Sequence, residues 1–268
     1  MTSWLCKACG TQYPDADAPP GACAICEDPR QYVPADEGQV WLSWDDVIAA
    51  HEADVRDDGG VLGIGMTPSF AIGQRALLVK SAAGNVLWDC VPYLDDDLIR
   101  RVVSEGGLAT IAISHPHYYS AMVEWARAFG CPILLHEADG VHVARPDPAV
   151  QLWSGETHVL GGGLTLIRCG GHFAGGQVLH WADRRILFAG DVVQVIPDRR
   201  FVSFMYSYPN LIPLPPSKVE AIAAALQSFA FDTIFGAWWG RIVPDGSDVV
   251  RRSAARYVRA VTEPGLPS

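Results

Sequence analysis

The sequence has no long hydrophobic run and no cluster of basic side chains. No segment approaches the roughly 20 apolar residues that cross a bilayer. The N-terminus also lacks a basic stretch followed by a hydrophobic one, so we predict neither a membrane span nor a secretory signal. The net charge is −10 and the arginine pairs are scattered, which argues against nucleic acid as a partner. We therefore expect a cytoplasmic protein, and the composition leaves a homo-oligomer open.

Cysteine is scarce except near the N-terminus. Of the 7 cysteines, three lie singly in apolar stretches, where buried and unreactive thiols are typical. The other four form the pairs Cys6-x-x-Cys9 and Cys23-x-x-Cys26 within residues 1–32. This segment has no periodicity long enough to build a core, so it needs a staple. Two pairs of thiolates suit a tetrahedral Zn²⁺ or a single Fe ion.

The chain is therefore predicted to divide into a four-cysteine segment at residues 1–32 and one larger domain at residues 33–268. The two cysteine pairs resemble the knuckles of a zinc ribbon or a rubredoxin-type site. A structural role follows from that interpretation, because the metal supplies what a core would otherwise provide. The alternative is a redox-active dithiol.

Strand-like and helix-like segments alternate from about residue 60 onward. Apolar runs typical of strands are 75–81, 85–91, 110–114, 131–139, 163–171, 176–182, 185–193 and 231–243. Helical spacing of apolar residues marks 95–105, 121–129, 217–229 and 247–261. The charged run 51–58 is expected to be the solvated end of a helix. Strands followed by helices, twice over, predict an α/β fold with two β-sheets packed face to face and helices outside.

Three histidines and one aspartate each follow an apolar strand. "SHPHYYS" carries His115 and His117, "GGHFAGG" carries His172, and "FAGD" carries Asp191. Side chains at strand ends project into a shared cleft, and the glycines beside His172 let the backbone approach an ion closely. Three neutral imidazoles and a carboxylate suit Zn²⁺, and three protein ligands leave one position for water. The pattern predicts a catalytic metal site.

In this order, the motifs resemble those of the metallo-β-lactamase superfamily, hydrolases built as an αββα sandwich. The resemblance covers roughly residues 60–268, with the four-cysteine ribbon added in front. It implies that His115, His117 and His172 hold the first metal. Asp191 would be a further ligand, or it would orient the attacking water.

The ligands of the family's second metal are missing from this sequence. Where the family has Asp and His after the histidine pair, this chain has Tyr119 and Ser120, and Trp239 in "GAWWG" replaces a late His. Because an indole offers only a donor, the departures imply a single-metal site. Tyr119 becomes a candidate catalytic donor to an oxyanion or leaving group, and Asp191 a candidate acceptor from the metal-bound water. The alternative for Tyr119 is an aromatic ring that fills a cavity.

An aromatic loop follows Asp191 and is a candidate substrate pocket. The predicted pocket residues are Phe204, Met205, Tyr206, Tyr208, Trp238 and Trp239. Such walls favour a small apolar or acyl substrate over a phosphorylated one. The alternative is that the loop packs in the core or forms a dimer surface.

Three functional hypotheses follow, in order of preference. The first is a mononuclear zinc hydrolase, in which a zinc-bound hydroxide attacks an ester, thioester, lactone or amide carbonyl of a small molecule. The second is a catalytically inactive metal- or ligand-binding member of the fold. The third is a redox protein with iron in either site. The expected cofactors are one Zn²⁺ at the histidines and one at the cysteines.

Overall fold

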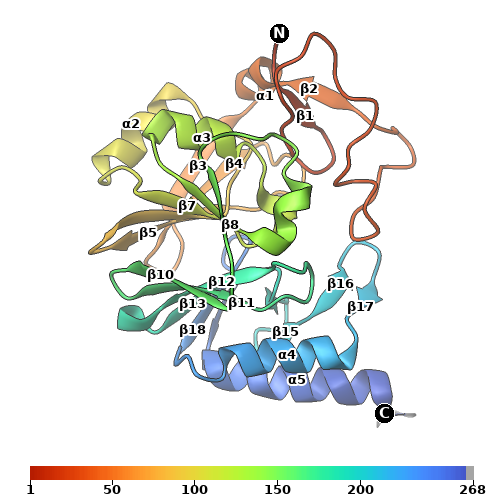
Figure 1. Ribbon diagram of the computed structural model, residues 1–268, viewed down its shortest axis with the longest axis vertical. Helices are drawn as coiled ribbons and strands as arrows, with labels where there is room; N and C mark the ends of the chain where they lie inside the picture. The colour runs from red at the N-terminus through yellow and green to blue at the C-terminus, as the bar shows by residue number, and fades with distance from the viewer. Residues whose placement is uncertain (264–268) are drawn as a thin grey trace.

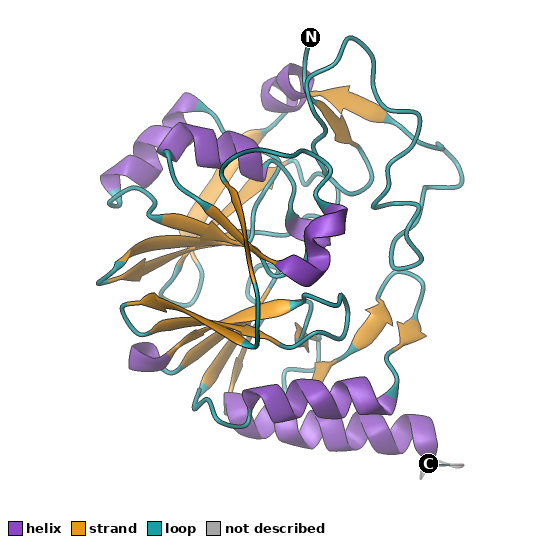
Figure 2. Ribbon diagram, viewed as in Figure 1, coloured by secondary structure: helices purple, strands orange, loops and turns teal. Residues whose placement is uncertain are grey.

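The chain folds into two β-sheets packed face to face, with helices on both outer faces (Figure 1). The structure is a computed structural model that describes residues 1–263. Figure 2 shows the succession of helices, sheet, sheet and helices. This arrangement confirms the predicted αββα sandwich. None of the described helices is both long and apolar enough to cross a membrane.

The first sheet has seven strands in sequence order, from β3 to β9. Their bounds are β3 (Glu52–Asp57), β4 (Leu62–Thr67), β5 (Ala76–Ser81), β6 (Gly84–Trp88), β7 (Thr110–Ala112), β8 (Ile133–His136) and β9 (Val150–Trp153). The strands from β3 to β6 are antiparallel and those from β6 to β9 are parallel. Parallel neighbours need crossovers, which here contain α2 (Asp96–Ser104) and α3 (Met122–Phe129).

The second sheet has six strands in the order β10-β11-β12-β13-β18-β19. Their bounds are β10 (Thr157–Gly161), β11 (Leu164–Arg168), β12 (Gln177–Trp181), β13 (Ile186–Gly190), β18 (Thr233–Gly236) and β19 (Ile242–Pro244). All neighbours are antiparallel except β13 and β18, which are parallel. The connection between those two contains α4 (Pro216–Leu226), and α5 (Gly246–Thr262) follows β19.

Hydrophobic side chains form three separate clusters between the four layers. The cluster that joins the two sheets contains Trp88, Phe188 and Phe235, and the last two rings lie 5.3 Å apart. A second cluster contains residues of α2, α3 and the first sheet, and a third contains residues of α4, α5 and the second sheet. Each sheet is therefore apolar on both faces, as expected for a sheet covered on both sides.

The local sequence explains where α2 begins and which face it buries. The carboxylate of Asp95 accepts a hydrogen bond from the backbone N–H of Leu98 at 2.7 Å, as an N-cap residue does. Leu98 and Val102, four residues apart, are the buried residues of the helix. The predicted helix at 95–105 is therefore confirmed.

The predicted secondary structure of the run 51–58 is wrong. The run 51–58, expected to be a helix end, forms the edge strand β3, paired antiparallel with β4. The preceding helix α1 (Trp44–Ala50) ends before it. In this run charged and apolar residues alternate, and an edge strand tolerates such a pattern because one face meets water.

The N-terminal cysteines lie in loops beside a two-stranded ribbon. Strand β1 (Trp4–Cys6) pairs antiparallel with β2 (Trp41–Ser43), so the pairing reaches past residue 32. The domain boundary at residue 32 stays a prediction. Two further two-stranded ribbons follow β13: β14 (Gln194–Val195) with β15 (Val202–Ser203), and β16 (Met205–Ser207) with β17 (Ile212–Pro213).

Candidate metal centre and its pocket

The three histidines come from loops at one edge of both sheets. His115 and His117 follow β7 of the first sheet, and His117 lies in a short 3₁₀ turn, Pro116–Tyr118. His172 lies in the loop between β11 and β12 of the second sheet, and Asp191 directly follows β13. The fold therefore brings together residues that are far apart in the sequence.

The geometry of the three imidazoles suits a metal ion. One ring nitrogen of each of His115, His117 and His172 lies within 4.8 Å of the others. His172 Nε2 and His117 Nδ1 are 3.2 Å apart. Two nitrogens bound to one tetrahedral Zn²⁺ at about 2.05 Å lie about 3.3 Å apart. Asp191 lies next to this group of three histidines, with its Oδ2 3.9 Å from His115 Nε2.

Hydrogen bonds to the other ring nitrogens fix two of these imidazoles. His172 Nδ1 lies 2.8 Å from the carbonyl oxygen of Tyr206, to which it donates, so Nε2 is left free. His115 Nδ1 lies 2.9 Å from Ser114 Oγ. Asp89 Oδ1 accepts the backbone N–H of Ser114 at 2.7 Å. Asp89 thus supports the site through Ser114, and the sequence analysis missed it because only the fold brings the two residues together.

Burial makes the three histidines neutral. It lowers the pKa of His115 and His117 well below the usual value and that of His172 to about 4. A neutral imidazole is the form that binds a metal. His115 Nε2 is buried and has no hydrogen-bond partner among residues 1–263, and the same is true of Asp191 Oδ1. These unsatisfied atoms beside one another fit a bound cation, because buried polar atoms otherwise carry a large cost.

The structure places Tyr119 away from the histidines and Tyr118 beside them. Both tyrosines belong to the hydrophobic core on the α3 side of the first sheet. The Tyr118 ring lies 4.4 Å from that of His115, whereas no ring contact within residues 1–263 joins Tyr119 to a histidine. Burial, followed by the charge of Asp191, raises the pKa of the Tyr118 hydroxyl. Burial raises the pKa of Asp191 to about 7, and Tyr118 opposes that shift. The tyrosine that faces the carboxylate is therefore Tyr118.

The two tryptophans differ in the same way, because Trp238 lies at the pocket and its neighbour Trp239 does not. Trp238 lines the pocket at the histidines, and its Nε1 donates to the carbonyl oxygen of Ile72 at 3.3 Å. Trp239, the residue aligned with the family's late His, stacks under Arg56 with 4.0 Å between guanidinium carbon and ring centroid. It packs against Gly63 of β4. Trp239 is a packing residue on the first sheet.

A cavity of about 250 Å³ opens onto His117, His172 and Asp191. Of the predicted pocket residues, only Tyr208 and Trp238 line it. The others take different places. Phe204 is fully buried in the α4–α5 core, Met205 and Tyr206 offer backbone carbonyls to His172, and Trp239 lies on the first sheet.

Three pocket residues come from the N-terminal segment, which no sequence pattern had assigned to the pocket. They are Ala8, Gln31 and Tyr32. Ala8 lies between Cys6 and Cys9, so the cysteine knuckle itself reaches the pocket. The remaining side includes Ala71 and Ile72 of the large domain.

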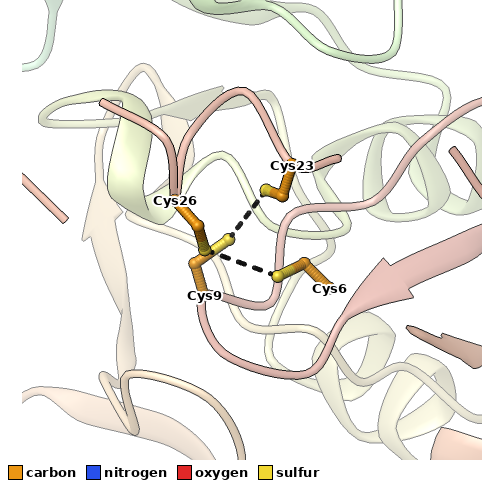
Figure 3. Close-up of side chains that lie close together, drawn as sticks. All are labelled: Cys6, Cys9, Cys23 and Cys26. Carbon is orange, nitrogen blue, oxygen red and sulfur yellow. Dashed lines mark hydrogen bonds between the residues drawn. The ribbon is translucent and has the colours of Figure 1, made fainter. Parts of the chain in front are cut away.

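The four N-terminal cysteines form a second metal-binding group, shown in Figure 3. Cys6 Sγ lies 3.5 Å from Cys26 Sγ, and Cys9 Sγ lies 3.6 Å from Cys23 Sγ. These distances exclude disulfides and approach the spacing of about 3.8 Å expected around tetrahedral Zn²⁺. Gln39 Nε2 donates to Cys6 Sγ at 3.2 Å. The group fits the predicted knuckle pair of a zinc ribbon.

Ionisation within the cysteine group also favours a cation. Hydrogen bonds from neighbouring thiols lower the pKa of Cys6, whereas burial raises the pKa of Cys9. Four buried sulfurs this close cannot all carry negative charge without a positive partner. The group therefore suits a metal that takes thiolate ligands.

Comparison with known proteins agrees with the fold. A family model described as "Metallo-beta-lactamase superfamily" matches residues 71–233, well over half of the chain. The uncharacterized protein YmaE of Bacillus subtilis (strain 168) is 44% identical over 268 residues, covering 97% of each chain.

Solved structures share the fold at low sequence identity. The metallo-β-lactamase FIM-1 from Pseudomonas aeruginosa, in its mono-zinc form, superposes with a TM-score of 0.59 at 14% identity, covering 79% of this chain and 97% of that one. TTHA1623 in a di-iron-bound form superposes with a TM-score of 0.54 at 18% identity, covering 71% of this chain and 97% of that one.

Proposed function

This chain belongs to the metallo-β-lactamase superfamily, and from that premise we propose that it is a metal-dependent hydrolase with a single metal ion at His115, His117 and His172. The superfamily consists mostly of metal-dependent hydrolases. The observation that carries the proposal is the set of three buried, neutral imidazoles, each of which has a ring nitrogen within 4.8 Å of those of the other two. A fold alone would not suffice, because function lies in the site.

Zn²⁺ is the metal we propose for the histidines. Held there, the ion supplies Lewis-acid chemistry, acidifying water and polarising a carbonyl. Support for one ion is the position of Tyr118 and Trp238, two aromatic side chains that lie beside Asp191 and the histidines. Proteins of this fold have been solved with one zinc ion, as in FIM-1, and with two iron ions, as in TTHA1623.

Asp191 is the group that would accept and return a proton. Its pKa, raised to about 7 by burial, lies near neutrality, where a general base and acid works best. Oδ1 would take a proton from the attacking water and later give it to the leaving group. Tyr118, kept protonated by burial, would favour the ionised form of this carboxylate, because it lowers the pKa of Asp191. The donor role predicted for Tyr119 is thereby proposed for Tyr118, as a positioning residue.

The pocket points to a small neutral substrate. At about 250 Å³ it is smaller than the cavities of about 300–1,000 Å³ that hold drug-sized ligands. Among residues 1–263, Asp191 is the only carboxylate that lines its walls, and no lysine or arginine does so. A phosphorylated substrate would find no cationic side chain in these walls, and the proposed metal ion would be its only charge partner. We therefore propose an ester, thioester, lactone or amide with a short apolar acyl group.

The test is a panel of activated short-chain esters, thioesters and lactams, assayed with the protein as purified. The variant His172→Ala is expected to lower hydrolysis by at least about 1,000-fold, because it removes a ligand of the group that stabilises the transition state. His158→Ala, on β10, is the matched control and should leave the rate unchanged. Elemental mass spectrometry should show one metal ion fewer in His172→Ala.

Two results would contradict the proposal. If the protein holds metal at the histidines but turns over nothing in the panel, the non-catalytic binding member is favoured. If His172→Ala loses its metal and keeps its rate, the histidine site is not the site of hydrolysis. An absorption band of ferric thiolate in the visible range would favour the iron-containing alternative, since Zn²⁺ is colourless.

A further inference from the structure

The N-terminal segment, residues 1–32, contributes to the pocket as well as holding the four cysteines, and it is called the ribbon from here on. Its Ala8, Gln31 and Tyr32 line the same cavity as His117 and His172. Tyr32 remains 51% exposed, so its ring lies where the cavity meets solvent. The N-terminal segment therefore forms part of the wall of the cavity that two of the three histidines also line.

Side-chain hydrogen bonds fasten this segment to the large domain. Asn210 Nδ2 donates to the carbonyl oxygens of Pro29 at 3.1 Å and of Gln31 at 3.0 Å. Ser207 Oγ donates to the carbonyl oxygen of Arg30 at 3.0 Å. In Figure 1 the N-terminal segment runs down one side of the molecule to meet the β16–β17 hairpin. The backbone on both sides of Arg30 is thus held in place.

Arg30 ties the segment directly to the loop of the third histidine. Its guanidinium carbon lies 3.6 Å from the centroid of the Phe173 ring, and Nη1 donates to the carbonyl oxygen of His172 at 3.2 Å. Asp28 binds the same guanidinium, with its two oxygens each 2.6 Å from a nitrogen. The ribbon therefore has a fixed position relative to the metal centre.

The other end of the ribbon is packed just as closely. Ile72, which lines the pocket, also packs against the hydrophobic cluster around the four cysteines. A Cβ on Gly10 would lie 3.2 Å from Ala71 Cβ, so the knuckle backbone touches the pocket wall. Ala8 lies between Cys6 and Cys9, and Cys26 lies shortly before the hydrogen-bonded segment 29–31. The cysteine group therefore fixes the position of both parts of the ribbon that line the pocket, Ala8 and Gln31–Tyr32.

From this placement we propose that the ribbon is a wall of the substrate pocket, and that the Gln31–Tyr32 segment limits the length of the acyl group admitted. The inference rests on the proposed hydrolase function for its substrate class. Tyr32 is the size-limiting side chain, and Asn210 is a positioning residue that holds the segment in place. No covalent step involves the ribbon.

The experiment measures chain-length preference in two independent ways. Hydrolysis of 4-nitrophenyl esters from acetate to decanoate gives kcat/KM against acyl length. Calorimetric binding of the matching alkyl methyl ketones, which cannot be hydrolysed, gives affinity against the same length without turnover. Both series are measured for the full-length metal-loaded protein and for Tyr32→Ala, Tyr32→Phe and Asn210→Ala.

In the natural protein, kcat/KM and ketone affinity should fall beyond a short acyl chain. Tyr32→Ala should raise both by about tenfold for chains longer by two methylene groups, and so move the cut-off to longer chains. Tyr32→Phe should keep the original cut-off, because the ring remains. Asn210→Ala should relax the cut-off in the same direction, whereas Leu211→Ala, at a neighbouring residue that is 79% exposed, should not.

The two series separate the inference from the function on which it rests. An unchanged cut-off in both Tyr32→Ala and Asn210→Ala overturns the ribbon wall even if esters are hydrolysed. A shifted ketone cut-off without ester hydrolysis supports the wall and rejects the hydrolase. Absence of both ketone binding and hydrolysis overturns both. Metal content and circular dichroism of each variant must match those of the natural protein for the comparison to count.

Discussion

At the scale of single residues, Asp191 and Tyr118 are buried and lie close enough for each to affect the pKa of the other. Neither Tyr118 Oη nor Asp191 Oδ1 meets hydrogen-bond geometry with any group in residues 1–263. Each nevertheless shifts the pKa of the other, after the larger effect of burial. Two unsatisfied oxygens at this depth are unusual in a purely structural setting. Their persistence fits a site that handles protons.

We therefore expect Tyr118→Phe and Tyr119→Phe to behave differently. Tyr118→Phe should lower kcat by about 10- to 100-fold, because Asp191 loses the neighbouring hydroxyl that opposes the rise of its pKa. Its free energy of unfolding should change by less than about 1 kcal/mol, since the lost hydroxyl had no good partner. Tyr119→Phe, whose ring lies in the core, should keep kcat within about threefold. Ester kinetics and urea unfolding measure both; a larger kcat loss in Tyr119→Phe would contradict the assignment.

A second carboxyl, Asp139, should make stability depend on pH. Its Oδ1 accepts the backbone N–H of Gly175 at 2.7 Å, and burial raises its pKa to about 6. Well below pH 4 the carboxyl is protonated in both the folded and unfolded states, so it causes no loss of stability. As the pH rises to about 6, the unfolded state ionises first, and the stability contributed by this group falls.

Asp139→Asn keeps an acceptor for Gly175 but cannot ionise. Above pH 6 we expect this variant to be more stable than the natural protein by about 1–3 kcal/mol, from a pKa difference of about two units. The difference should shrink toward pH 4. Asp147→Asn serves as a control of opposite sign, because a lowered pKa makes the Asp147 carboxylate stabilising at neutral pH. Urea unfolding at pH 4 and pH 7.5 gives the free energy of unfolding of each protein. A difference between Asp139→Asn and the natural protein that does not change with pH would contradict this prediction.

At the scale of elements, β4 is shaped to accept a large side chain from the β18–β19 connection. Two glycines of β4, Gly63 and Gly65, leave room for the indole of Trp239. Arg56 of β3 covers the same ring. The packing joins the edge of the first sheet to the second sheet, which explains why Trp239 does not reach the metal centre.

Gly63→Ala should therefore destabilise the sandwich. The added Cβ would lie 2.3 Å from Trp239 Cζ3 and 3.3 Å from Arg75 Cδ, and overpacking of this kind costs about 1–3 kcal/mol. Gly21→Ala is the control and should cost much less, because an added Cβ there has no atom of residues 1–263 within 4 Å beyond its chain neighbours. Urea unfolding measures both, and metal content should be unchanged. Equal stability of the two variants would show that Trp239 can move aside freely.

At the scale of the whole molecule, one pocket is lined by two of the metal-binding histidines and by a residue that lies between two of the metal-binding cysteines. His117 and His172 of the histidine group line this pocket, and so does Ala8, which lies between Cys6 and Cys9. The cysteine group therefore belongs to the architecture of the site as well as to the stability of the N-terminus. Binding of a structural metal contributes directly to the folding of the segment that holds it.

We expect about two metal ions per chain in protein purified without added metal. Cys23→Ser and His172→Ala should each remove about one ion, and the double variant both. Elemental mass spectrometry gives the counts, and cysteine modification shows which group has been emptied. Cys23→Ser should also make the N-terminal segment sensitive to protease while the large domain stays folded. About one ion in the natural protein, assigned to the cysteines, would leave the histidines without metal.

Local sequence patterns were enough to predict the fold class and the residues of the histidine group and the cysteine group. Strand and helix periodicity predicted two β-sheets packed face to face with helices outside, because buried faces impose period 2 or 3.6 on apolar residues. The resemblance of the histidine motifs identified this arrangement as the αββα sandwich. The Cys-x-x-Cys spacing and the histidines at strand ends predicted the two groups that the structure brings together. Each of these features depends on local spacing or on strand order, which a linear pattern records.

Which of two neighbouring residues faces the pocket follows instead from the three-dimensional packing. Tyr118 rather than Tyr119 contacts a metal-binding histidine, and Trp238 rather than Trp239 lines the pocket. Both pairs occur in turns, where no fixed period relates one side chain's direction to the next, so alignment to a motif can err by one residue. The support of His115 by Asp89 through Ser114, and the contribution of Tyr32 to the pocket, arise from contacts between distant segments. Such contacts depend on how the whole chain packs, which local sequence does not encode.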